Sequence, residues 1–107
     1  MICKSYEPFF KTLAEPTKLE IINLLSRGPM CVSVISMKLG YEQSRVSHNL
    51  KALADRHFVT VLRKGKERIY ALDEKVIIPI LRLIDQYVER YDKHMCKCKG
   101  IPWRNRT

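Results

Sequence analysis

The sequence predicts a mainly α-helical domain with a small β-hairpin, because of three features of residues 31–72. A short apolar helix there ends at Gly40, a residue that permits a tight turn between two helices. A second helix follows, in which apolar residues recur every three or four positions. A basic hairpin then turns at Gly65-Lys66. This order of elements is that of a winged helix-turn-helix, and it predicts contact with DNA.

The second of these helices has one apolar and one polar face. Val46, Leu50 and Leu53 recur at i, i+4 and i+7 and predict a buried stripe. The opposite stripe carries donors and acceptors that can reach base edges and phosphates in a major groove. Its members are Gln43, Ser44, Arg45, Ser47, His48 and Lys51. Polar stripes usually face only solvent, but serine is a mediocre helix former whose small hydroxyl permits close approach to phosphates. We therefore expect this helix to read DNA.

The hairpin is expected to consist of Val59 to Lys64, a turn at Gly65-Lys66, and Glu67 to Leu72. Four cations cluster toward its tip: Arg63, Lys64, Lys66 and Arg68. Lysines can also protect an exposed edge strand from aggregation, but that role needs charges along the edge more than at the tip. The cations therefore predict a contact with the phosphate backbone or an insertion into the minor groove. Just before the hairpin, His57 is expected to cap the end of the reading helix.

The segment EPTKLEIINLLSRGPMCVSVISMKLGYEQSRVSHNLKALADRHFVTVLRKGKERIYAL resembles the ArsR/SmtB family of small dimeric repressors that respond to metals or metalloids. The resemblance extends from about Phe9 to Leu72, is strongest in QSRVSHNLKAL, and continues in the helical region that follows. It implies that the strands around Lys64 to Lys66 form a wing, and that five residues of the polar stripe lie on a recognition helix: Gln43, Ser44, Arg45, Ser47 and His48. It also implies a homodimer bound to a double-stranded operator, which we expect to be palindromic.

Length and composition agree with one small domain. The chain has 107 residues, of which 46% are hydrophobic and 29% charged. We expect residues 1–95 to form a winged-helix DNA-binding and dimerisation domain, followed by a basic, cysteine-containing tail at 96–107. No apolar run approaches the roughly 20 residues that span a bilayer, and MICKSYEP lacks a signal-peptide core. A cytoplasmic location is therefore expected.

The distribution of the net charge of +9 indicates the kind of partner. Residues 28–58 contribute +2, residues 59–72 contribute +3 and residues 96–107 contribute +4, whereas residues 73–95 contribute −1. A polyanion explains this distribution better than a need for solubility. Membrane binding is disfavoured, because it needs a basic amphipathic helix and the most apolar helix here lacks excess positive charge.

No catalytic pattern accompanies these features. A Ser/His/Asp set, a P-loop, paired acids and a dinucleotide fingerprint are all missing from the sequence, so we do not expect an enzyme. The alternative class is a winged helix that binds protein or RNA without an effector, with the basic face contacting a partner but not reading duplex sequence.

Two N-terminal helices are expected to complete the core. The first, about Ser5 to Leu13, has an aromatic stripe that usually indicates packing, although the resemblance implies that this helix also packs across a dimer. The second is expected from Pro16 to about Ser26. Its predicted core residues are Leu19, Ile22 and Leu25.

The last helix is expected to form the interface of a dimer. Asp73 can cap it, and Pro79 either kinks it or is its first residue. The apolar stripe from Ile80 to Tyr91 rises about 17 Å, which is too long for one small core. We therefore expect burial against the same helix of a second subunit. The predicted interface residues are Tyr6, Phe9, Ile80, Leu83, Ile84, Tyr87 and Tyr91.

Cysteine chemistry is expected to provide the response to an effector. Cys31 begins a helix, where the N-terminal dipole favours thiolate. The resemblance implies a C-x-C pair at this point, but Ser33 occupies the second position, so the usual arsenite site is incomplete. The carboxylate and histidine set that other family members use on the last helix is also poorly matched.

The tail offers further thiols. Cys96 and Cys98, with His94 nearby, could bind As(III), Cd, Zn or Cu(I) together with Cys31, and Cys3 is a further candidate ligand. Thiol redox or persulfide sensing, and no function for the cysteines, are the alternatives. We expect no organic cofactor.

Overall fold

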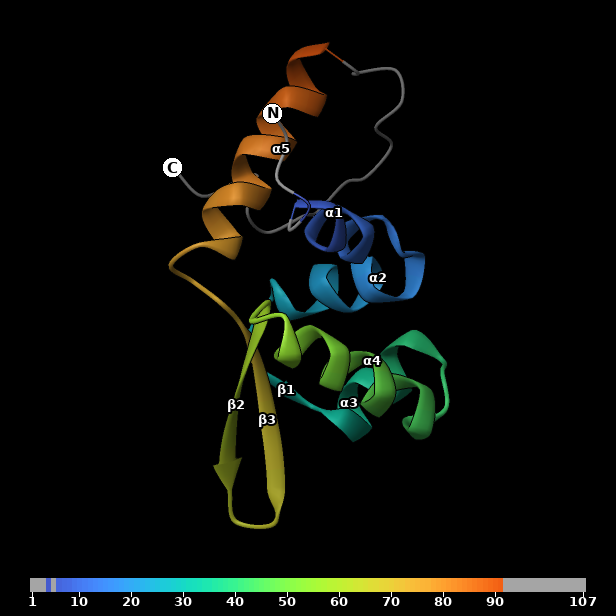
Figure 1. The fold of residues 1–107 in the computed structure, drawn as a ribbon. Helices are drawn as coiled ribbons and strands as arrows, with labels where there is room; N and C mark the ends of the chain where they lie inside the picture. The colour runs from blue at the N-terminus through green and yellow to red at the C-terminus, as the bar shows by residue number, and fades with distance from the viewer. Residues whose placement is uncertain (1–3, 5, 92–107) are drawn as a thin grey trace.

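The computed structural model describes residues 4 and 6–91, and Figure 1 shows their arrangement. The described residues form five helices and one three-stranded antiparallel sheet, the architecture of a winged helix-turn-helix. The elements in order are α1 (Tyr6–Ala14), α2 (Pro16–Leu25), β1 (Met30–Cys31), α3 (Val32–Leu39), α4 (Gln43–Asp55), β2 (Val59–Lys64), β3 (Glu67–Leu72) and α5 (Ile77–Tyr91). In Figure 1 the β2–β3 hairpin and α5 extend from the helical body in opposite directions.

The hairpin has the predicted bounds and turn. Its register runs from Val59 opposite Leu72 to Lys64 opposite Glu67, and Gly65 in the turn has φ 66°. We call this β2–β3 hairpin the wing. The sheet also contains β1, which pairs with β3 and gives the order β1-β3-β2. The sequence did not predict β1, because two residues are too few for an alternating pattern.

The helix α4 supplies the predicted stripe to the core. Val46, Leu50 and Leu53 are all 0% exposed, which confirms their expected burial. The expectation for α2 was wrong at Leu19, which is 37% exposed, while Ile21 is 0% exposed. The buried face of α2 follows Thr17, Ile21 and Leu25 at four-residue spacing, together with Ile22, and this leaves Leu19 at its edge.

The ends of α3 and α4 fix the helix-turn-helix. Gly40 has φ 73°, a left-handed conformation that glycine adopts without a Cβ penalty, and its N–H donates to the Ser36 carbonyl. His57 has φ 62° and donates its N–H to the Ala54 carbonyl, while Phe58 donates to the Leu53 carbonyl. This pair of hydrogen bonds is a Schellman motif, so His57 ends α4 as predicted.

The first helix contributes less to the core than expected. Phe9 stacks on Phe58 with ring centroids 5.2 Å apart, and Leu13 packs against the core. Tyr6 and Phe10 are 56% and 60% exposed, so only part of the aromatic stripe packs in the core of one chain, and Tyr6 stays a predicted residue of the dimer interface. A nine-residue helix presents only one narrow face to α2, and these two rings lie outside it.

The start of α5 differs from both alternatives for Pro79. The Asp73 carboxylate accepts hydrogen bonds from the N–H groups of Val76 and Ile77 at 2.8 and 3.0 Å, and the helix begins at Ile77. Pro79 therefore neither kinks a longer helix nor begins this one, but lies in its first turn, where its missing N–H costs little. Within the described part of the chain, no helix is both long and apolar enough to span a membrane.

Candidate nucleic-acid interface

The polar face of α4 is exposed at all six predicted positions: Gln43, Ser44, Arg45, Ser47, His48 and Lys51. The face exists because the buried stripe of α4 packs on α2 and the sheet, and this packing directs the remaining side chains outward. The sequence thus predicted the orientation of this helix from its apolar spacing alone.

The wing divides its cations between two faces. Strand alternation places Arg63 and Arg68, which are directly opposite each other in the register, on the face that carries Val61 and the buried Tyr70. Lys64 is opposite Glu67 on the other face, and Lys66 lies in the turn. All four cations are exposed, so each is accessible to an external partner.

A groove of about 720 Å³ lies between α4 and the wing. Its lining includes Ser47 and Lys51 from α4 and Arg63 and Arg68 from the wing. None of the residues that line this groove is acidic. Like charges directly opposite on neighbouring strands destabilise a hairpin, so the Arg63–Arg68 pair is unfavourable until an anion lies between or beside the two guanidinium groups. The groove is therefore suited to a phosphate.

One residue of the α4 face is engaged within the chain. The Arg45 guanidinium lies 3.8 Å over the centre of the Tyr41 ring, and its Nη2 donates to the Thr17 hydroxyl at 2.7 Å. Tyr41 in turn donates its hydroxyl to the Glu20 carboxylate at 2.7 Å, and this hydrogen bond raises the pKa of Tyr41. Sequence reasoning missed these partners, because Thr17 and Arg45 are 28 positions apart.

Cys31 joins the helix-turn-helix to the wing. It is the residue before α3, is half-buried, and pairs with Ile69 of β3. Its Sγ lies 3.2 Å from the Ser33 hydroxyl, and the hydrogen bond with that hydroxyl, followed by one from the Val34 N–H, lowers the pKa of the thiol. The direction of this shift is the one expected at the start of α3, but its largest cause is the hydroxyl of Ser33, a residue singled out in the sequence only because it replaces a thiol.

The described residues do not complete a metal site around Cys31. They contain no group of three or more His, Cys, Asp or Glu residues that could hold an ion, and Ser33 offers only a hydroxyl. Cys3, Cys96 and Cys98, the other predicted ligands, lie outside the described residues, as does His94.

The predicted dimer face is largely uncovered in the single chain. Leu83, Tyr87 and Tyr91 are 57–65% exposed, and Ile84 is 41% exposed. Tyr6 of α1 is also exposed, whereas Ile80 and Phe9 are half-buried and Phe9 stacks within the chain. The Tyr87 and Tyr91 rings contact each other with centroids 5.3 Å apart.

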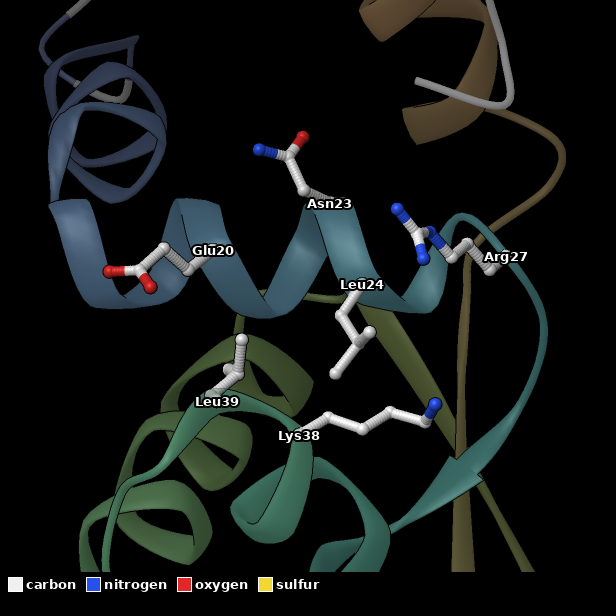
Figure 2. Close-up of a pocket in the computed structure, with 6 residues that line it drawn as sticks. All are labelled: Glu20, Asn23, Leu24, Arg27, Lys38 and Leu39. Atoms are coloured by element: carbon white, nitrogen blue, oxygen red, sulfur yellow. The ribbon is translucent and has the colours of Figure 1, made fainter. Parts of the chain in front are cut away.

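A second groove of about 480 Å³ lies between α2 and α3 and is shown in Figure 2. Leu24 points from α2 toward α3, whereas Asn23 points away from it. The lining mixes one acid, Glu20, with two cations, Arg27 and Lys38. Because its charges are of both signs, this groove is less suited to a polyanion than the groove beside the wing.

Comparison with known proteins agrees with this geometry. Residues 15–61 match the family of bacterial regulatory proteins described as the arsR family. An arsenical resistance operon repressor of Bacillus subtilis (strain 168) is 33% identical over 81 residues, which are 75% of this chain and 77% of that protein. The crystal structure of AntR, an antimony-specific transcriptional repressor, is similar with a TM-score of 0.65 and 29% identity, covering 78% of this chain and 77% of that one.

A further similarity concerns the fold. A homodimeric winged helix-turn-helix domain of Mycobacterium bovis has a TM-score of 0.76 and 23% identity, and the similarity covers 89% of this chain and 87% of that one. The family match and the 33% identity with the repressor of Bacillus subtilis identify the family of this chain. The chain belongs to the ArsR family and is a transcriptional repressor, not an enzyme.

Proposed function

We propose that this repressor is a homodimer that binds a palindromic operator through α4 and the wing of each subunit. The main support is the groove between these elements, where Arg63, Arg68 and Lys51 converge without an acidic neighbour in the lining. A phosphate there would relieve the repulsion between the paired arginines, and this contact would set the position of α4 in a major groove. Lys64 and Lys66 would contact the backbone farther along the wing.

Selection of operator sequences from random duplexes tests this proposal. The full-length protein is expected to enrich one class of palindromic site, and its complex should survive competitor DNA in a band shift at several salt concentrations. Equal loss of all duplexes as salt rises would contradict sequence-specific binding. Preference for a single-stranded or structured RNA over every duplex would instead support the alternative class.

Alanine substitution of the paired arginines should reduce the salt dependence of operator binding. Each phosphate contact contributes about 0.9 to the slope of log K against log salt, so Arg63→Ala/Arg68→Ala, which acts in both subunits of the dimer, should lower the slope by roughly 2 to 4. Fluorescence anisotropy at five salt concentrations would measure it. Arg27→Ala/Lys38→Ala is the matched control, because it removes two cations from the groove between α2 and α3 and should leave the slope nearly unchanged. Equal effects of the two variants would contradict the assignment of the groove.

We further propose that a soft metal or metalloid releases the repressor from DNA by binding cysteine thiolates. The named responses of the relatives, arsenical resistance and antimony, support this class of effector. The lowered pKa of Cys31 makes it a suitable ligand, and the tail at 96–107 would supply Cys96 and Cys98, with Cys3 as a further candidate. Since Cys31 pairs with β3, a ligand bound there would act on the strand that carries Arg68.

Loss of the tail thiols should uncouple the response from DNA binding. Cys96→Ser/Cys98→Ser is expected to keep operator affinity but lose the effect of As(III) or Cd, which in the wild type should weaken binding by roughly 5- to 150-fold. Native mass spectrometry of reduced wild type and variant with each ion would measure occupancy. Release by oxidant or persulfide alone would favour redox sensing. Unchanged affinity with every thiol-directed ligand would contradict any sensing role for the cysteines.

A further inference from the structure

The first turn of α4 is attached to α2 by side chains that are distant in sequence. Arg45 donates to the hydroxyl of Thr17, a residue that is only 6% exposed, and its guanidinium covers the Tyr41 ring. We call Thr17, Tyr41 and Arg45 the clasp. A hydrogen bond from a charged donor and a cation–π contact each favour this arrangement over a free side chain.

Both partners of Arg45 are themselves held in place. The Tyr41 hydroxyl donates to Glu20 of α2, and the Tyr41 carbonyl accepts a hydrogen bond from the Ser36 hydroxyl. Thr17 lies in the first turn of α2, which the Glu15 carboxylate caps through the N–H groups of Thr17 and Lys18. The clasp therefore joins Arg45 to a capped helix end and to an anchored ring.

A second link lies one turn farther along α4. Lys18 donates from Nζ to the Asn49 side-chain oxygen at 3.1 Å, and Asn49 donates from Nδ2 to the Arg45 carbonyl at 2.9 Å. Asn49 is only 8% exposed. The backbone and the side chain of Arg45 are thus both connected to the N-terminal turn of α2, and this pair of links resists rotation of α4 about its axis.

The neighbours of Arg45 on the same face differ from it. Gln43, Ser44, Ser47 and His48 are exposed, as Arg45 is, but their side chains make no hydrogen bond or ion pair with any residue that the structure describes. These four groups can turn toward a base at little cost. Arg45 would first have to give up the Thr17 hydroxyl and the Tyr41 ring.

We infer that Arg45 is a positioning residue that sets the orientation of α4 on DNA through Thr17 and Tyr41, and that the bases are read by its free neighbours. The inference rests on the proposed binding of DNA by α4. It gives Arg45 a different role from that expected of a long cation on a recognition helix. It also assigns a role in DNA binding to Thr17, a buried side chain of α2.

A double-mutant cycle in the full-length protein tests this role. Thr17→Val keeps the shape of the side chain but removes the acceptor, so it should weaken operator affinity by about five- to tenfold, as should Arg45→Ala. The double variant should be no weaker than Arg45→Ala alone. Base preference, measured by selection from randomised operators, should keep the wild-type pattern in all three variants.

Thr12→Val is the matched control, because the buried Thr12 hydroxyl donates to the Pro8 carbonyl within α1. The operator affinity of this variant should remain that of the wild type.

The remaining measurements separate positioning from the competing explanations. Thermal unfolding and sedimentation of each variant show whether the fold and the dimer persist. If Thr17→Val unfolds, Tyr41→Leu removes the other contact of the Arg45 side chain and should weaken operator affinity in the same way. Gln43→Ala, by contrast with the clasp variants, should alter the preference at one base pair of each half-site. Two results would overturn the inference. Arg45→Ala could relax the preference at a base pair, or it could lower the salt slope by about 2 for the dimer while Thr17→Val and Tyr41→Leu bind as wild type. Wild type that selects no duplex would instead contradict the proposed function.

Discussion

Replacement of Ile84 by glutamate is expected to abolish the dimer and, with it, operator binding. In the proposed interface the new carboxylate would be buried opposite its own copy without a counter-ion, at a cost of several kcal/mol per ion. A palindromic operator presents two half-sites, so a monomer loses the second set of contacts. Sedimentation velocity at micromolar concentration would measure association, and a band shift on the selected operator would measure binding. Tyr87→Glu should have the same effect.

Leu19→Glu is the matched control for this experiment. Leu19 of α2 is 37% exposed, close to the 41% of Ile84, but lies outside the proposed interface. The control should therefore remain dimeric, with a change in stability within about 0.5 kcal/mol, as is usual at exposed positions. A wild type that is monomeric at micromolar concentration would contradict the proposed dimer, as would an Ile84→Glu variant that sediments as a dimer.

The elements that the sequence predicted most closely are those specified by local chemistry. Val46, Leu50 and Leu53 define the buried side of α4 by spacing alone, and Gly65 defines the hairpin turn, so bounds and register could be inferred. The same spacing predicted which side of α4 is exposed. It could not predict that Arg45 contacts Thr17, because that contact depends on how α2 crosses α4.

The errors have a common cause in packing between elements. Leu19 and Phe10 are apolar residues at helical spacing, yet both are exposed in the single chain. Spacing shows that a helix has an apolar side but does not show how wide a strip its neighbours cover. The strand β1 was missed for a related reason, since only its partner β3 makes Met30 and Cys31 a strand.

The second large effect is expected at Phe58, which contacts α1, the end of α4 and the residue that follows β3. Its side chain is 1% exposed and stacks on Phe9 of α1. Its N–H donates to the Leu53 carbonyl at the end of α4, and its carbonyl accepts from the Asp73 N–H at 3.0 Å. Phe58→Ala should lower the free energy of unfolding by about 3–5 kcal/mol, because it removes the ring that stacks on Phe9 and leaves a cavity in the core, although both backbone hydrogen bonds remain. Chemical denaturation at one fixed protein concentration would measure it, since a dimer's stability depends on concentration.

Phe10→Ala is the control for Phe58, because it removes the same side chain from the same aromatic cluster. Phe10 contacts Phe9 edge-on with centroids 5.3 Å apart, but it is 60% exposed, so its loss leaves no enclosed cavity. We expect Phe10→Ala to cost less than about 1 kcal/mol, in line with the cost of one exposed aromatic pair. Equal costs at the two positions would mean that Phe10 is buried in the assembled protein, and the interface would then have to include more of α1 than Tyr6 and Phe9. A cost below about 1 kcal/mol at Phe58 would contradict the packing of α1 on the winged helix.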